Sequence, residues 1–204
     1  AYDQEAGNVP PLTQPFTHSP PAARIGARND LNLAYRAGRA TAAELALAGI
    51  NLNLAPVLDV NSNPDNPIIG TRAFGVEPKT VGAMSSAWAR GLREGGMIPC
   101  GKHFPGHGDT NEDSHFDLPV VTRSLAQIQA VELPPFVDAC RSGIEALMTA
   151  HVKFTALDLN DVATLSEPIV TGLLRHQLGY DGVVFSDDME MKAVSDRYEP
   201  CEAA

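Results

Sequence analysis

The alternation of helix-like and strand-like stretches constrains this chain more than any other feature of its sequence. Ala- and Leu-rich segments with capping residues predict helices, and short apolar runs that end in polar turns predict strands. The expected helices are 29–49, 78–94, 124–140 and 166–178, and the expected strands are 50–59, 97–104, 144–151 and 182–186. The Pro134–Pro135 pair should kink or split the third helix. Repeated strand–helix units imply parallel strands, hence a β/α barrel or a doubly wound sheet.

Side chains able to carry chemistry follow these strands. They stand at or near predicted carboxyl ends, and they are Asp3, Asp59, Lys102, His103, His151 and Asp187. Both a β/α barrel and a doubly wound sheet bind ligands at that edge. We therefore expect these side chains to share one site.

The composition limits the classes of protein that this chain can belong to. With 204 residues, 44% of them hydrophobic and 20% charged, it should fold around one sizeable core or at most two small ones. A net charge of −10 argues against a nucleic-acid partner. No apolar run approaches the about 20 residues that span a bilayer, so a membrane protein is not expected. Three widely spaced cysteines match no disulfide framework and predict reduced thiols in the cytoplasm.

The densest cluster of reactive side chains lies between residues 101 and 115, which include three histidines, two aspartates and a lysine. A solvated loop explains any single histidine there, but it explains the whole cluster poorly. A metal site built from His103, His107, Asp113 and His115 is a weaker hypothesis, because the spacing matches no standard zinc pattern. A phosphate-binding loop is weaker still, since GxxxxGK[ST] is absent from the sequence.

Acid–base chemistry accounts best for this segment. In Asp113-Ser114-His115 a carboxylate stands two residues from an imidazole, where it can orient the ring and stabilise its protonated form. This predicts His115 as a general acid/base. The nucleophile should come from another strand end, and Asp187 is well placed for it. The alternative role for Asp187-Asp188 is helix capping, which Asp188 can provide while Asp187 faces the pocket.

The run KHFPGHG at 102–108, followed by DSH at 113–115, resembles the signature of glycoside hydrolase family 3, in its β-N-acetylhexosaminidase (NagZ-like) branch. Four further segments match the family in the same order along the chain: 3–5, 55–60, 70–74 and 182–188. The resemblance implies a TIM-type (β/α) barrel. It also implies that residues 1–204 are one catalytic domain, incomplete here because the family's first and last strands are absent, and thus part of a longer domain.

The resemblance further implies a retaining exo-glycosidase that releases terminal β-linked N-acetylglucosamine. Asp187 would be the nucleophile, and His115 the acid/base backed by Asp113. Asp3, Arg72, Lys102 and His103 would contact the sugar. The ordinary alternatives are surface salt bridges for Arg72 and Lys102, and structural polarity for Asp3. His151 is expected to support the pocket rather than react.

The same resemblance implies a small GlcNAc-containing, muropeptide-type saccharide as partner, cytoplasmic peptidoglycan-sugar turnover, and no metal or cofactor. One substrate arginine of the family is replaced here by Pro11. A β-glucosidase or a glycoside phosphorylase of the same family is the enzymatic alternative. A non-catalytic sugar-binding relic is the other alternative.

Overall fold

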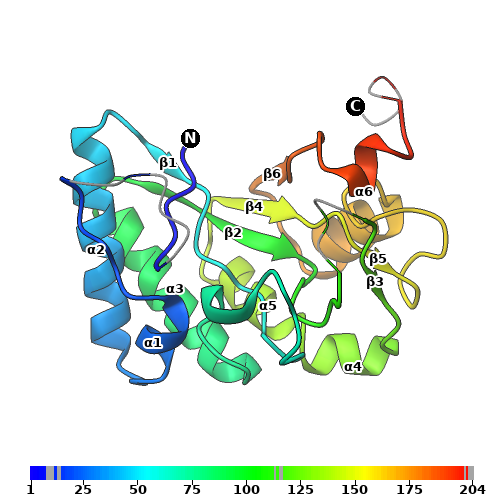
Figure 1. Ribbon diagram of the computed structural model, residues 1–204, viewed down its shortest axis with the longest axis horizontal. Helices are drawn as coiled ribbons and strands as arrows, with labels where there is room; N and C mark the ends of the chain where they lie inside the picture. The colour runs from blue at the N-terminus through cyan, green and yellow to red at the C-terminus, as the bar shows by residue number, and fades with distance from the viewer. Residues whose placement is uncertain (8–11, 13–14, 113, 115–116, 200, 202–204) are drawn as a thin grey trace.

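The computed structural model describes residues 1–7, 12, 15–112, 114, 117–199 and 201, and its centre is a parallel sheet (Figure 1). The sheet has the order β1-β2-β4-β6, in which the strands span Leu52–Asn53, Ile98–Phe104, Ala146–Thr149 and Val183–Ser186. Every neighbouring pair is parallel. Because spatial order follows chain order without reversal, the winding is that of a β/α barrel rather than a doubly wound sheet. The predicted TIM-type fold is confirmed, with an open sheet in the described part.

Two parallel bridges bring further segments to this sheet. Tyr2 pairs with Asn53, and Val57 pairs with Lys102. The first places Asp3 beside the end of β1, and the second places Asp59 beside the carboxyl end of β2, as the predicted clustering of strand ends requires. The expected strand 50–59 is thus largely extended backbone that pairs only at these few positions. A second, two-stranded parallel sheet joins β3 (Val120–Val121) to β5 (Lys153–Phe154), both outside the expected strands.

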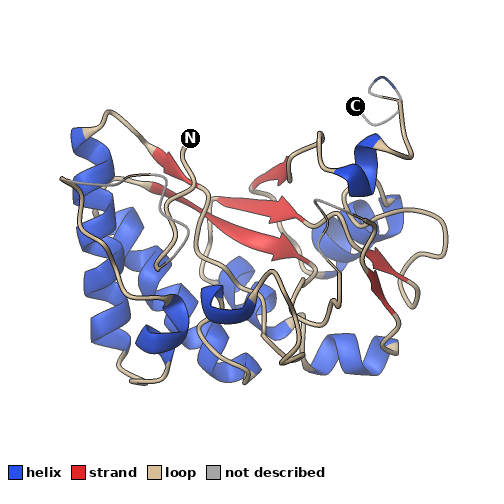
Figure 2. Cartoon of the chain, viewed as in Figure 1, coloured by secondary structure: helices blue, strands red, loops and turns tan. Residues whose placement is uncertain are grey.

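The helices lie outside the sheet (Figure 2). They are α1 (Ala22–Gly26), α2 (Leu31–Leu47), α3 (Pro78–Glu94), α4 (Leu125–Ala130), α5 (Pro134–Arg141), η2 (Pro168–Gln177) and α6 (Lys192–Ser195), with a 3₁₀ turn at η1 (Gly70–Arg72). The Asp30 side chain caps α2 by accepting from two backbone N–H groups, and the bounds of α3 match the prediction. Among the described residues, no helix is long and apolar enough to cross a membrane.

The expected helices 124–140 and 166–178 both form, the first split at the proline pair as predicted and the second with an unexpected winding. The expected helix 124–140 is split into α4 and α5, because Pro134 lacks an N–H and begins a new helix instead of continuing the old one. The expected helix 166–178 forms, but η2 is wound as a π-helix, with the backbone N–H of Leu178 donating to the carbonyl of Leu173.

Close packing of α2 against α3 depends on glycine. A Cβ on Gly38 would lie 2.1 Å from the Trp88 carbonyl oxygen, and one on Gly91 would lie 2.2 Å from that of Tyr35. The two helix backbones therefore approach more closely than any side chain would allow. This contact fixes the N-terminal side of the fold.

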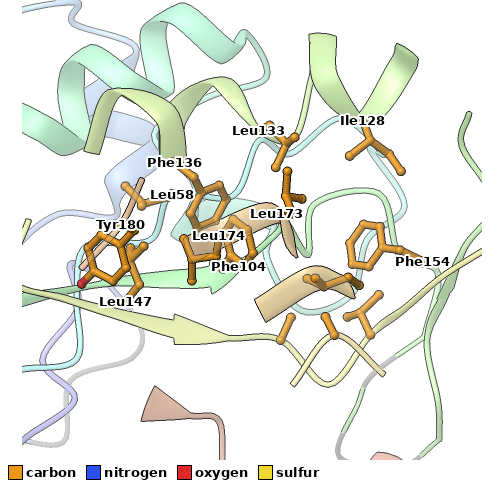
Figure 3. Close-up of a cluster of buried hydrophobic side chains, with 14 of the residues drawn as sticks. Leu58, Phe104, Ile128, Leu133, Phe136, Leu147, Phe154, Leu173, Leu174 and Tyr180 are labelled. Carbon is orange, nitrogen blue, oxygen red and sulfur yellow. The ribbon is translucent and has the colours of Figure 1, made fainter. Parts of the chain in front are cut away.

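The main hydrophobic core lies between the sheet and the helices that follow β2 and β5 (Figure 3). Phe104, the last residue of β2, packs edge to face on Phe136 of α5, with ring centroids 5.4 Å apart. Leu147 of β4 and Leu174 of η2 complete the contact. β2 is buried along six of its seven residues, whereas β6 is the partly exposed edge of the described sheet. The core thus holds β2 rigidly at the end of the strand that carries Lys102 and His103.

Candidate active site

A pocket of about 350 Å³ opens at the carboxyl ends of the strands. Its walls include the Asp187 side chain and all four residues predicted to bind sugar, and the lining residues are Asp3, Pro67, Ile68, Arg72, Lys102, His103, His107, Ser114, Asp187 and Met191. These residues come from sequence positions up to 188 apart, and the parallel winding brings their strand ends to one edge. The pocket is therefore the candidate active site.

A second hollow of about 830 Å³ lies beside β6 and α6. Its walls are mainly apolar and include Val170, Val184, Val194 and Tyr198, with Glu190 at the rim. None of the predicted site residues lines it. Size alone therefore does not identify the reactive pocket in this fold.

A network of four charged side chains forms one wall of the pocket. The Lys102 ammonium lies 2.6 Å from Asp3 Oδ1 and 2.7 Å from Glu5 Oε1. Arg72 binds both Glu5 oxygens, with Nε and Nη2 at 2.8 and 2.7 Å. This geometry makes the ion pairs of Arg72 and Lys102 part of the pocket wall, not of the outer surface.

The two cations of this network keep the Glu5 carboxylate ionised. Burial alone would raise the pKa of Glu5, but the adjacent Lys102 and Arg72 lower it to about 2. Burial likewise opposes the charge of Lys102, yet Glu5 and Asp3 raise its pKa above the ordinary range. Glu5 was not among the site residues predicted from the sequence. It stands two residues after Asp3 in extended chain, where alternate side chains share a face, and that spacing was the available signal.

His103 is oriented by a buried aspartate. Asp59 Oδ2 lies 2.7 Å from His103 Nδ1, and the same carboxylate accepts the backbone N–H groups of His103 and His107. Burial opposes the charge of Asp59, but His103 and the His107 N–H lower its pKa below the ordinary value. An ionised carboxylate only accepts hydrogen bonds, so His103 Nδ1 carries a proton and Nε2 faces the pocket.

Asp187 lies where β6 ends, with its Oδ2 4.0 Å from His103 Nε2. Its other oxygen accepts the backbone N–H of Asp188 at 2.9 Å. Burial raises the pKa of Asp187, but His103, the Asp188 N–H, His151 and Lys102 together lower it below the ordinary value. Asp187 is therefore an ionised carboxylate in a pocket that Lys102 and Arg72 also line, which suits a nucleophile.

His151 supports the segment that carries Asp187. Its Nε2 lies 2.9 Å from the Asp188 carbonyl oxygen, and its Nδ1 lies 2.8 Å from Thr164 Oγ1. A carbonyl only accepts, so Nε2 carries the proton. Burial lowers the pKa of His151, which keeps the ring neutral near pH 7. The side chain thus fixes the backbone next to Asp187 without lining the pocket.

The predicted acid/base pair, Asp113 and His115, lies outside the described residues, as does Pro11. Ser114, which separates the pair in the sequence, lines the pocket. Its carbonyl accepts the Ala193 N–H at 3.2 Å, and its hydroxyl lies 3.5 Å from His107 Nε2. The Ser114 backbone is thereby tied to the segment that follows Asp187.

His107 is a structural member of the pocket. Its Nδ1 lies 2.8 Å from Thr110 Oγ1, and burial together with His103 lowers its pKa to about 4. The ring is therefore neutral near pH 7. Among the residues that the structure describes, no three side chains of the metal-ligating types gather as a ligand set. Two members of the metal hypothesis, Asp113 and His115, are not among them.

Comparison with known proteins points to one family. The sequence profile described as "Glycosyl hydrolase family 3 N terminal domain" matches residues 1–204. A protein named "Beta-hexosaminidase" from Chromobacterium violaceum is 41% identical over 197 residues, which cover 94% of this chain and 55% of that protein. The chain therefore spans about half the length of this curated relative.

Solved structures agree with the profile. A glycoside hydrolase family 3 beta-N-acetylglucosaminidase from Paenibacillus sp. superposes with a TM-score of 0.97 at 44% identity, covering 98% of this chain and 38% of that one. NagZ from Neisseria gonorrhoeae, solved in complex with N-trifluoroacetyl-D-glucosamine, superposes with a TM-score of 0.87 at 38% identity, covering 96% and 59%. The likeness extends over nearly all of this chain.

Proposed function

The chain belongs to glycosyl hydrolase family 3, and we propose that it carries the active site of a retaining exo-glycosidase for terminal β-linked N-acetylglucosamine. The observation that carries the proposal is the ionised Asp187 at the end of β6, in one pocket with Asp3, Arg72, Lys102 and His103. The names of the relatives, beta-hexosaminidase and beta-N-acetylglucosaminidase, support the choice of sugar.

The reaction would proceed in two balanced steps. First, an Asp187 oxygen bonds to the anomeric carbon while the bond to the leaving oxygen breaks, and protonated His115 gives its proton to that oxygen. Second, neutral His115 takes a proton from water as the water oxygen bonds to the anomeric carbon and releases Asp187. Asp113 would orient the imidazole and stabilise its cation. The place of Ser114 in the pocket supports this assignment.

The charged side chains of the pocket wall would bind the sugar. Lys102 has three N–H donors, and Asp3 and Glu5 accept two of them, which leaves one for a hydroxyl oxygen of the sugar. The Asp3 side chain, 40% exposed, can accept a hydroxyl proton. His103 Nε2 faces the same space. Arg72 would act mainly by holding Glu5, since two of its nitrogens already bind that carboxylate.

We place this activity in the turnover of peptidoglycan-derived sugars, with a muropeptide-type saccharide as substrate and the cytoplasm as location. The free thiols of Cys100, Cys140 and Cys201 support a reducing compartment. We further propose that residues 1–204 act within a single β/α-barrel catalytic domain. A GlcNAc analogue bound to the Neisseria gonorrhoeae relative supports the saccharide class.

The first test compares hydrolysis of 4-nitrophenyl β-N-acetylglucosaminide by the wild type, Asp187→Ala and Asp188→Asn. Asp187→Ala should lose at least roughly 10³-fold in kcat/KM, because it removes the nucleophile. Asp188→Asn is the matched control, because the Asp188 side chain is exposed and accepts the Glu190 N–H without lining the pocket. Equal rates for wild type and Asp187→Ala would contradict the nucleophile assignment.

Product analysis separates the alternatives. A folded wild type that binds N-acetylglucosamine but hydrolyses nothing would indicate a sugar-binding relic. Release of a sugar phosphate in the presence of inorganic phosphate would indicate a phosphorylase. Preference for the aryl β-glucoside would indicate a β-glucosidase.

The acid/base is tested separately. His115→Ala should lose more activity on substrates with poor leaving groups than on 2,4-dinitrophenyl glycosides, which need no protonation of the leaving oxygen. A uniform loss across leaving groups would argue against this role for His115.

A further inference from the structure

A second network of charged side chains lies outside the pocket, at the base of the loop between β2 and β3. Arg123, two residues after β3, lies 2.7 Å from Asp109 Oδ1 through Nη2 and 2.8 Å from Glu132 Oε1 through Nη1. Asp109 and Arg123 have side chains that are 21% exposed, and Glu132 has a side chain that is 1% exposed. One guanidinium therefore bridges two carboxylates from different parts of the chain.

The position of this bridge in the sequence gives it a specific consequence. Asp109 precedes Asp113 by four residues, and Arg123 follows His115 by eight. The Arg123–Asp109 pair thus joins the incoming and outgoing limbs of the segment that includes the predicted acid/base pair. Fixing both limbs reduces the conformational freedom of the chain between them.

Glu132, between α4 and α5, contacts the beginning of the same loop as well as Arg123. Gly106 has a φ of +140°, and a Cβ there would lie 2.8 Å from Glu132 Cβ, so the beginning of the loop rests directly on this side chain. Glu132 Oε2 is buried and has no hydrogen-bond partner among the described residues. A carboxylate buried with one cation is a poor way to stabilise a fold. The arrangement is therefore better suited to positioning Arg123 and the start of the loop than to stabilising the fold.

The geometry points to Arg123, held by Glu132, as a positioning residue for the acid/base loop: it fixes Asp109, from which the chain continues to the predicted acid/base pair Asp113 and His115. This rests on the proposed function, in which His115 is the acid/base. Burial raises the pKa of Glu132 to about 7 even though Arg123 lies beside it. This agrees with a role for Glu132 in positioning the Arg123 side chain rather than in balancing its charge.

The test uses Arg123→Gln, Asp109→Asn and the double variant of the full chain, with aryl β-N-acetylglucosaminides of increasing leaving-group pKa. Each single variant should lose about 10-fold in kcat on poor leaving groups and less than about 3-fold on activated ones. The double variant should be no worse than either single one, because both break the same contact. The matched control is Arg93→Gln, which removes the paired contact with Glu145 far from the pocket and should change neither rate.

A second readout does not depend on activity. Hydrogen exchange of the amides at 106–112 should become at least about 10-fold faster in Arg123→Gln and stay unchanged in Arg93→Gln. If Arg123→Gln fails to fold, Glu132→Gln keeps the side-chain shape and should show the same effects more weakly. Unchanged exchange, or an equal loss on all leaving groups, would overturn the positioning role. Protected amides in a wild type without hydrolysis would instead contradict only the proposed function.

Discussion

Glu5 and Glu132 are both almost fully buried, with side chains 3% and 1% exposed, yet their surroundings act on them in opposite directions. Burial raises the pKa of each, but two cations, Lys102 and Arg72, lower that of Glu5 to about 2. Within the described part of the chain, Glu132 faces a single guanidinium that it shares with Asp109, and its pKa rises to about 7. For these two carboxylates, the number of neighbouring cations decides whether the effect of burial on the pKa is overcome.

The difference also separates two kinds of polar structure in one fold. The Glu5 network forms the pocket wall and is fully compensated, so it presents fixed charges to a ligand without reorganising. The Glu132 network lies behind a loop and is under-compensated, so it contributes little to stability. We therefore expect substitutions in the two networks to differ in size and in pH dependence.

The largest effect should come from Lys102→Met, which removes the cation between Asp3 and Glu5. Breaking a buried ion network by removing one partner typically costs about 3–5 kcal/mol, because the remaining charges are left uncompensated. Urea unfolding at pH 7 measures the free energy of unfolding, with exposed Lys79→Met as control. A loss below about 1 kcal/mol would show that the network contributes no more than an exposed pair.

Glu5→Gln should be the next largest. The folded pKa of Glu5 lies below its ordinary value of 4.5, at about 2, so its charge stabilises the fold above pH 4.5 and this contribution fades as pH falls to about 2. At 1.36 kcal/mol per pKa unit, the variant should lose about 3 kcal/mol at pH 7. The difference in free energy of unfolding between wild type and Glu5→Gln should become smaller as the pH is lowered from 7 to 3. A gap that does not change with pH would contradict the lowered pKa.

Glu132→Gln should behave in the opposite way. Its folded pKa lies above the ordinary 4.5, at about 7, so ionisation destabilises the fold progressively as pH rises between those values. The variant avoids this cost, and after discounting for solvent screening it should gain about 1–2 kcal/mol relative to wild type between pH 4.5 and pH 8. Thermal unfolding at both pH values is the measurement. A relative loss with rising pH would show that Glu132 is fully compensated.

The smallest effect should come from Arg93→Gln. The Arg93–Glu145 pair has good geometry, at 2.6 Å, but both side chains are about one-third exposed. An exposed pair contributes about 0.2–1 kcal/mol, and salt screens it. The difference in free energy of unfolding between wild type and Arg93→Gln should be small in 50 mM salt and disappear in 500 mM salt. It would give the contribution of an exposed ion pair, with which the two buried networks can be compared.

Much of the fold follows from local sequence signals. Pro78 and Gly95 delimit α3, Asp30 caps α2, and Pro134 separates α4 from α5, and each acts through its own backbone or capping chemistry. The short pair β3–β5 was missed because two-residue strands carry no periodic pattern. The π-winding of η2 was missed because π-helices are rare and the signals at 166–178 are those of an ordinary helix.

The sequence by itself determined which side chains stand at strand ends, because apolar runs and polar turns are local patterns. From this it selected Asp3, Lys102, His103 and Asp187, the family resemblance added Arg72, and the tertiary structure brings all five to one pocket. Only the tertiary structure decided that Glu5 binds both Lys102 and Arg72, and that Glu132 pairs with the Arg123 guanidinium, which it shares with Asp109. Such charge balance depends on distances between segments up to 97 residues apart, and on burial, neither of which a local pattern encodes.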